Sequence, residues 1–157
     1  DLNLLTFQTA KTLRFVEYGN LELVNAPNTI EFQRPIVNQN PLILGRKESE
    51  VTISVVDSRI ISEQWYLYAY IDNELTSQDG KYTLTNSLIF VTDTNEIKTL
   101  GKNPTLIYTG TANEGNTKTT EITWNQKTGI LFQVIEPLYN GETYKTSINW
   151  ILTSEKL

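Results

Sequence analysis

Histidine, cysteine and methionine are all missing from this sequence of 157 residues. Without histidine the chain lacks the commonest general base and zinc ligand, and it cannot form a Ser-His or Cys-His dyad. Without cysteine it has neither a disulfide framework nor a thiolate metal site. We therefore expect a protein that is not an enzyme and that uses no metal or other cofactor.

Long apolar runs and an excess of positive charge are missing as well. No window approaches the roughly 20 apolar residues of a membrane span, so we expect no membrane insertion. The net charge of −5 disfavours nucleic acid as a partner, because a phosphate backbone attracts a basic surface. The absence of methionine and the start at Asp1 are consistent with signal-peptide removal or with excision from a longer chain.

What the sequence does contain is an alternation of apolar and polar residues with a period of two, which is typical of β-strands. The clearest alternating stretches are residues 51–55, 65–71, 122–124, 130–135 and 144–152.

Turn signals separate these stretches at short intervals, and among them are Asp79-Gly80, Thr128-Gly129 and Asn140-Gly141. Many short strands with polar turns predict an all-β sandwich or barrel of mostly antiparallel strands. We expect one domain over residues 1–157, with a single helical turn at residues 95–100.

Two copies of the tripeptide Trp-x-Leu lie in these strands, one with Trp65 and Leu67 and the other with Trp150 and Leu152. Residues two apart share one face of a strand, so each copy places an indole beside an isobutyl group. Exposed indoles would stack on sugars or anchor a partner. Burying such an aromatic side chain stabilises a fold by roughly 1.5–3 kcal/mol or more. The alternation favours the core for all four residues, on two facing strands.

Three tyrosines occupy the opposite positions of the first of these strands. If Trp65 points inward, Tyr66, Tyr68 and Tyr70 form an outward row at two-residue spacing. Tyrosine joins an apolar ring to a hydroxyl group, which suits glycan or protein contacts. We interpret the row as a candidate binding face, and the alternative is ordinary cross-strand packing on a strand covered on both faces.

Several charged residues are candidates for structural or chemical roles. Asp57 and Arg59 share one face, and we expect an ion pair that fixes the loop before the first Trp-x-Leu motif. Arg34, Arg46 and Lys47 form a small basic patch that could meet a carboxylate or a phosphate, although a solvated loop is the favoured interpretation.

The carboxylates do not form a recognisable catalytic or metal-binding pattern. The closest clusters are Glu48-Ser49-Glu50 and Asp72-Asn73-Glu74, but a glycosidase needs two carboxyl groups at a set separation across a cleft. The stretch at residues 93–96 lacks the ligand spacing of an EF-hand loop.

Taken together, these segments resemble the WxL domain of low-GC Gram-positive bacteria. The match includes the hydrophobic strand at 51–56 followed by Asp57-Ser58-Arg59, and the early segment at 21–32 with its proline turn. It also includes the closing run at 141–152. Order and spacing agree from residue 21 to the end, while residues 1–20 match less clearly. The chain departs from the family at residues 60–64, which are not glycine-rich.

The resemblance implies a secreted domain at the bacterial cell surface that attaches non-covalently to peptidoglycan. It also implies a partner, a membrane-anchored protein whose Ig-like regions bind WxL domains. One alternative is a protein–protein module whose main ligand is that Ig-like protein. Another is an adhesin or carbohydrate-binding domain for a host extracellular ligand.

Overall fold

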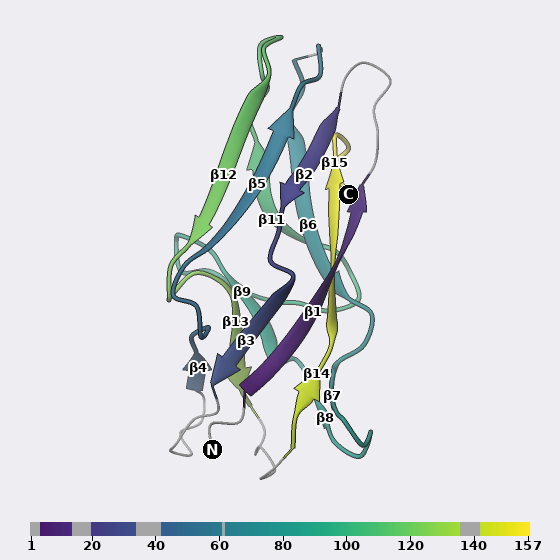
Figure 1. Cartoon of the computed structure of the whole chain (residues 1–157), viewed down its shortest axis with the longest axis vertical. Helices are drawn as coiled ribbons and strands as arrows, with labels where there is room; N and C mark the ends of the chain where they lie inside the picture. Colours follow the sequence, from purple (N-terminus) through teal and green to yellow (C-terminus); the bar gives the residue numbers. More distant parts are fainter. Residues whose placement is uncertain (1–3, 14–19, 34–41, 61, 136–141) are drawn as a thin grey trace.

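The computed structural model describes residues 4–13, 20–33, 42–60, 62–135 and 142–157. Within these ranges the chain forms strands and no α-helix, and so contains no helix long and apolar enough to cross a membrane. Most strands run along the long axis of the molecule (Figure 1). The expected all-β fold is confirmed.

The largest sheet carries both Trp-x-Leu motifs. Its spatial order is β11 (Thr105–Gly110), β6 (Trp65–Ile71), β15 (Ser147–Thr153), β1 (Leu4–Leu13) and β3 (Thr29–Gln33). Neighbouring strands are antiparallel, except that β1 and β15 run parallel. The strand β15 therefore lies in the middle of this sheet, between β6 and β1.

Three smaller sheets complete the described fold. The first is β12 (Lys118–Trp124), β5 (Val51–Asp57) and β2 (Leu21–Asn25). The second is β10 (Ile97–Thr99), β9 (Leu88–Val91), β13 (Gly129–Val134) and β4 (Leu42–Leu44). The third is β14 (Tyr144–Lys145), β7 (Leu75–Ser77) and β8 (Thr83–Leu84).

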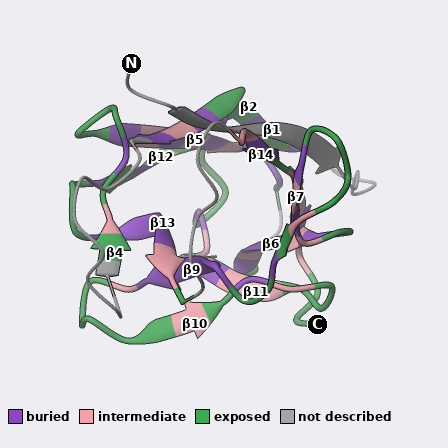
Figure 2. Ribbon diagram, turned by 90° about the horizontal axis from the view of Figure 1, so that it is seen from below, coloured by how far each residue is buried: buried purple, intermediate pink, exposed green. Residues whose placement is uncertain are grey.

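The strands surround one interior, which is seen end-on in Figure 2. The alternation in β5 is as predicted, because Val51, Ile53 and Val55 are buried and the residues between them are half-buried. Trp124 joins the sheets at the centre, since its ring lies 6.2 Å from that of Trp150 and 5.9 Å from that of Phe90. The hydrophobic effect of this shared core holds the separate sheets together.

Gly129 makes room for the Trp124 indole. A Cβ atom at this glycine would lie 2.2 Å from Cδ2 of Trp124, and the backbone φ is +86°. Only glycine meets both conditions without strain, so the Thr128-Gly129 turn signal also marks a packing requirement.

The helical turn expected at residues 95–100 is wrong. Asn95 closes a tight turn with a φ of +64°, and its amide donates to the Thr92 carbonyl at 2.9 Å. Residues 97–99 then pair with β9 as β10. Asparagine tolerates the left-handed region better than most residues, and the pairing with β9 determines the conformation of the segment that follows.

Candidate functional site

Both Trp-x-Leu motifs lie in the core. Trp65, Leu67, Trp150 and Leu152 are each 1% exposed or less, as the alternation predicts. The expectation of two facing strands is wrong, because β6 and β15 are neighbours in one sheet and Leu152 pairs with Leu67. Adjacent strands bring the two motifs together through main-chain hydrogen bonds as well as side-chain packing.

The Trp65 indole is fitted closely against β11. Gly110 is its register partner, and a Cβ atom there would lie 1.8 Å from Cε2 of Trp65. The Tyr108 ring lies 5.5 Å from the Trp65 ring. Because the indole fills the space over a glycine, it has no face left for a ligand, and the motif acts as a packing element.

A buried ion pair stands at the end of β5, as expected. Arg59 is fully buried and Asp57 is 2% exposed. The guanidinium donates through Nε at 2.8 Å and through Nη2 at 2.7 Å to the two carboxylate oxygens of Asp57. Nη2 also donates to the Glu63 carbonyl at 2.9 Å, so the pair holds the segment that leads into Trp65.

Asn113 ties a second loop to this pair. Its Nδ2 donates to the Arg59 carbonyl at 2.7 Å. The loop between β11 and β12 is thereby fixed against the end of β5. The ion pair and its amide neighbour form a buried polar network that organises two connections of the fold.

The tyrosine row is not the exposed face that the sequence predicts. Tyr66 and Tyr70 are half-buried, but Tyr68 is only 4% exposed. The Tyr68 hydroxyl accepts a hydrogen bond from the Leu157 amide at 2.9 Å. The C-terminal segment therefore contacts Tyr68 on the face of β6 that the alternation predicts to be exposed.

The interpretation of the basic patch as a solvated loop is wrong for Arg46. This side chain is 6% exposed, and its Nη1 donates to the carbonyls of Thr128 at 2.8 Å and Ile130 at 3.0 Å. Nη2 donates to the Asn125 carbonyl. Arg46 thus holds the turn that connects β12 to β13.

The charge of Arg46 is balanced by dipoles and an aromatic ring. No described carboxylate forms an ion pair with it, and its guanidinium carbon lies 5.8 Å from the Trp124 ring centre. Burial lowers the pKa of the Arg46 guanidinium below its usual value, but arginine stays protonated in proteins.

The other two members of the basic patch differ from Arg46. Lys47, which is exposed, pairs with the half-buried Glu31 at 3.5 Å. Arg34 lies outside the described residues. The three residues therefore do not form one anion-binding site in the part of the molecule that the structure describes.

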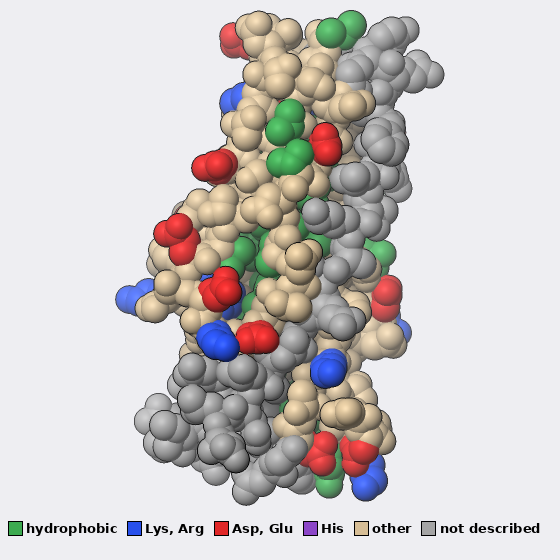
Figure 3. All heavy atoms as spheres, viewed as in Figure 1, with side chains coloured by type: hydrophobic (Ala, Val, Ile, Leu, Met, Phe, Trp, Pro, Cys, Tyr) green, Lys and Arg blue, Asp and Glu red, His purple; other side chains and the backbone are tan. Residues whose placement is uncertain are grey.

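A cavity of about 370 Å³ lies between the β2–β3 connection and the start of β5. We call it the polar groove. Its lining residues are Asn25, Pro27, Thr29, Ile30, Glu31, Arg46, Glu48, Glu50, Val51 and Thr52. Figure 3 shows apolar side chains at the bottom of a hollow near the middle of this face, with charged side chains around it.

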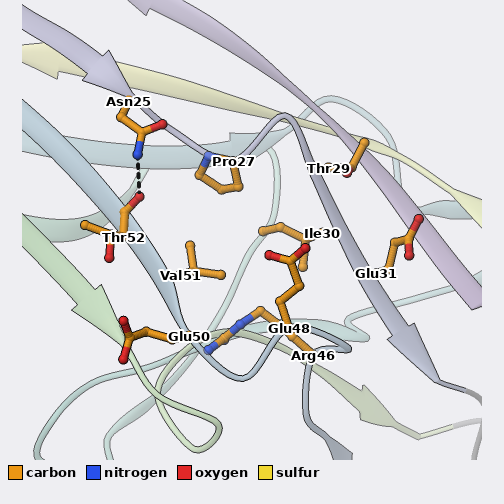
Figure 4. A pocket seen from close by; sticks show the side chains of 10 residues that line it. All are labelled: Asn25, Pro27, Thr29, Ile30, Glu31, Arg46, Glu48, Glu50, Val51 and Thr52. Atoms are coloured by element: carbon orange, nitrogen blue, oxygen red, sulfur yellow. Dashed lines mark hydrogen bonds between the residues drawn. The ribbon is translucent and has the colours of Figure 1, made fainter.

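The polar groove offers hydrogen-bonding groups above a small apolar floor. Figure 4 shows Glu31, Glu48 and Glu50 spread across it, while Asn25 donates to the Thr52 carbonyl at 3.0 Å. Glu48 and Glu50 are exposed and form no ion pair with a described residue. Such a groove can accept hydrogen bonds from hydroxyl, amide or amino groups of a ligand while an apolar face rests on its floor.

The remaining acidic clusters serve local structure. Asp72 accepts a hydrogen bond from Asn149 Nδ2 at 3.0 Å, and Glu74 accepts one from the Asn86 amide at 3.3 Å. The stretch at residues 93–96 forms the β9–β10 turn. Across the described ranges, no group of three or more acidic side chains is placed to hold a metal ion.

Comparison with protein-family models and with curated proteins finds no match to this chain.

Proposed function

We propose that this chain is a non-catalytic, secreted domain that attaches non-covalently to peptidoglycan at the surface of a Gram-positive cell. The proposal rests on the resemblance to WxL domains. The observation in the structure that supports it best is the polar groove, where carboxylates, hydroxyls and an amide surround an apolar floor. A polymer of sugars and short peptides offers the matching donors and apolar ring faces.

The volume of the groove suits this ligand class. About 370 Å³ falls within the range of pockets that hold small ligands, roughly 300–1,000 Å³. It is sufficient for a short unit of a polymer, and the polymer would extend beyond it over neighbouring strands. Binding would then come from several moderate contacts, and many copies of the unit along the wall would add avidity.

Co-sedimentation with purified peptidoglycan sacculi, stripped of wall polymers, tests the proposal. We expect the domain to pellet with the sacculi and to stay bound in high salt, because hydrogen bonds and apolar contacts are screened less than exposed charges. The double variant Glu48→Ala and Glu50→Ala should lose most of its retention. These side chains are exposed and unpaired among the described residues, so the fold should be unaffected.

The matched control is Glu22→Ala with Glu63→Ala. It removes two exposed carboxylates outside the polar groove and makes the same change in net charge. Retention of this control should equal that of the original chain. A domain that fails to pellet with bare sacculi would refute direct attachment, and an Ig-like membrane-anchored partner would then become the leading ligand. Release by soluble sugars of a host type would favour the adhesin alternative.

A further inference from the structure

The strand β12 is a long open edge of its sheet. All seven of its residues pair with β5 in unbroken register, from Lys118 opposite Asp57 to Trp124 opposite Val51. On its other side β12 pairs with no strand in the described ranges, and Figure 1 shows it at one border of the molecule. Its outward amide and carbonyl groups are therefore available for pairing with another chain.

The other described edges are shorter or interrupted. The strands β4 and β10 have three residues each, and β3 has five. A register shift interrupts β11, and another interrupts β2. Native proteins commonly protect an exposed edge by such shortening or bulging. β12 has neither device and contains no proline.

A second groove borders β12, and we call it the edge groove. It measures about 230 Å³ and lies between β12 and the strands β9 and β11. Its lining includes Phe90, Asp93, Ile107, Glu121, Ile122 and Trp124. Two carboxylates thus accompany an apolar floor, and no lysine or arginine is among the lining residues.

We propose that β12 binds an extended segment of another protein as an added β-strand. Main-chain hydrogen bonds to the open edge would supply affinity, and alternate side chains of the segment would supply specificity. Because β12 borders the edge groove, apolar side chains at every second position of the segment would enter it. A lysine or arginine of the segment would meet Asp93 or Glu121.

A second copy of this chain fits the edge less well. Antiparallel pairing of β12 with itself over all seven residues places Lys118 opposite Trp124 and Glu121 opposite Glu121. Like charges directly opposite each other destabilise a strand pair. The two carboxylates of the edge groove favour a segment that carries positive charge. The net charge of −5 also disfavours a second copy of this chain, because the two copies would repel each other.

A displayed library of random peptides of about nine residues, selected on the whole folded chain, tests this inference. We expect the enriched peptides to alternate apolar residues and to carry at least one lysine or arginine. Binding of the best peptide should slow amide hydrogen exchange along β12 and leave β2 unchanged. Methylating the peptide nitrogens that face β12 should weaken binding about tenfold, because main-chain donors are lost.

Charge variants of the two outer strands of this sheet give a matched comparison. Glu121→Lys should lower the affinity for the enriched peptide about threefold, whereas Glu22→Lys on β2 should leave this affinity unchanged. Both residues are exposed, and both substitutions change the net charge equally. Sacculus retention should be the same in both variants, which separates this inference from attachment through the polar groove.

Three results would overturn strand addition at β12. The first is a library that yields no enriched sequence, and the second is exchange protection that falls outside β12. The third is protection of β12 amides that rises with protein concentration in the absence of peptide, because it would identify a second copy as the occupant.

Discussion

Two of the arginines that the structure describes, Arg46 and Arg59, are buried, and their charges are stabilised in different ways. Arg59 meets the carboxylate of Asp57, two residues away, in a bidentate pair. Arg46 meets main-chain carbonyls of residues 125–130, about 80 residues away in the sequence, and the face of Trp124. One buried charge is neutralised by an opposite charge, and the other is stabilised by dipoles and an aromatic ring.

This difference determines what each arginine holds in place. The Asp57–Arg59 pair fixes local chain geometry, the segment between β5 and β6, and closes it with the Glu63 carbonyl. Arg46 joins two distant parts of the fold, because it comes from the segment before β5 and holds the β12–β13 turn. Removing Asp57 should therefore leave a buried charge unpaired, whereas removing Arg46 should leave buried carbonyl groups without a donor.

The largest loss of unfolding free energy should follow Asp57→Ala, which leaves the Arg59 charge buried and unpaired. Breaking a buried pair from one side costs about 3–5 kcal/mol, and urea unfolding measures the loss. Asp57→Ala combined with Arg59→Met should recover part of that free energy, since no charge then remains buried. A loss below about 1 kcal/mol for Asp57→Ala would contradict the buried-pair account, because exposed pairs contribute that little.

A smaller effect should follow Arg46→Met, which removes a buried charge and leaves carbonyls of the β12–β13 turn without their donor. Unsatisfied buried groups cost about 1–3 kcal/mol, and hydrogen exchange of residues 125–130 should rise along with the loss of stability. Arg46→Lys should lose less stability than Arg46→Met but more than none, because an ammonium group lacks the planar fork of donors. Equal stability of the Met and Lys variants would indicate that the carbonyl contacts contribute nothing.

The smallest effect should come from an exposed carboxylate, which extends the comparison to the surface. Hydrogen bonds from the Ser77 hydroxyl at 2.7 Å and from the Lys81 amide at 3.1 Å hold the pKa of Asp79 below its usual value. A lowered folded-state pKa contributes stability above the unfolded value, near 3.9, and this contribution is lost as pH falls through the folded value.

Unfolding measured in urea across acidic pH checks this expectation. Asp79→Asn should slightly reduce the slope of the unfolding free energy against pH in the acidic range. Near neutral pH that slope should be unchanged. An NMR titration of the Asp79 carboxyl carbon supplies the pKa directly. A midpoint above the usual aspartate value would reverse the sign and contradict the role of the Ser77 and Lys81 donors.

The sequence predicts the local features of the fold well and the long-range ones poorly. The alternation in residues 51–55 and the spacing of Asp57 and Arg59 depend on neighbours in the chain, and both predictions agree with the structure. Arg46 lies in a polar stretch that resembles any solvated loop. No local pattern indicates that carbonyls about 80 residues later will surround it.

The candidate site likewise depends on long-range contacts that no local sequence pattern indicates. The turn near Pro27 and the glutamates at 48 and 50 are visible separately in the sequence, but only the fold brings them to one groove. The exposure predicted for Tyr68 is wrong for a related reason. Alternation predicts which face a side chain occupies, whereas the coverage of that face by residues near 157 depends on tertiary structure.

The central place of β15 has a consequence for how this molecule acquires its structure. The strand joins β6 to β1, so the largest sheet has a gap in its middle until residues 147–153 are in place. Pairing between such distant segments carries a high loop-closure cost and makes folding slow. During synthesis from the N-terminus, β1 and β6 would therefore remain unconnected in the main sheet. They could join only once residues 147–153 had left the ribosome and β15 could pair with both.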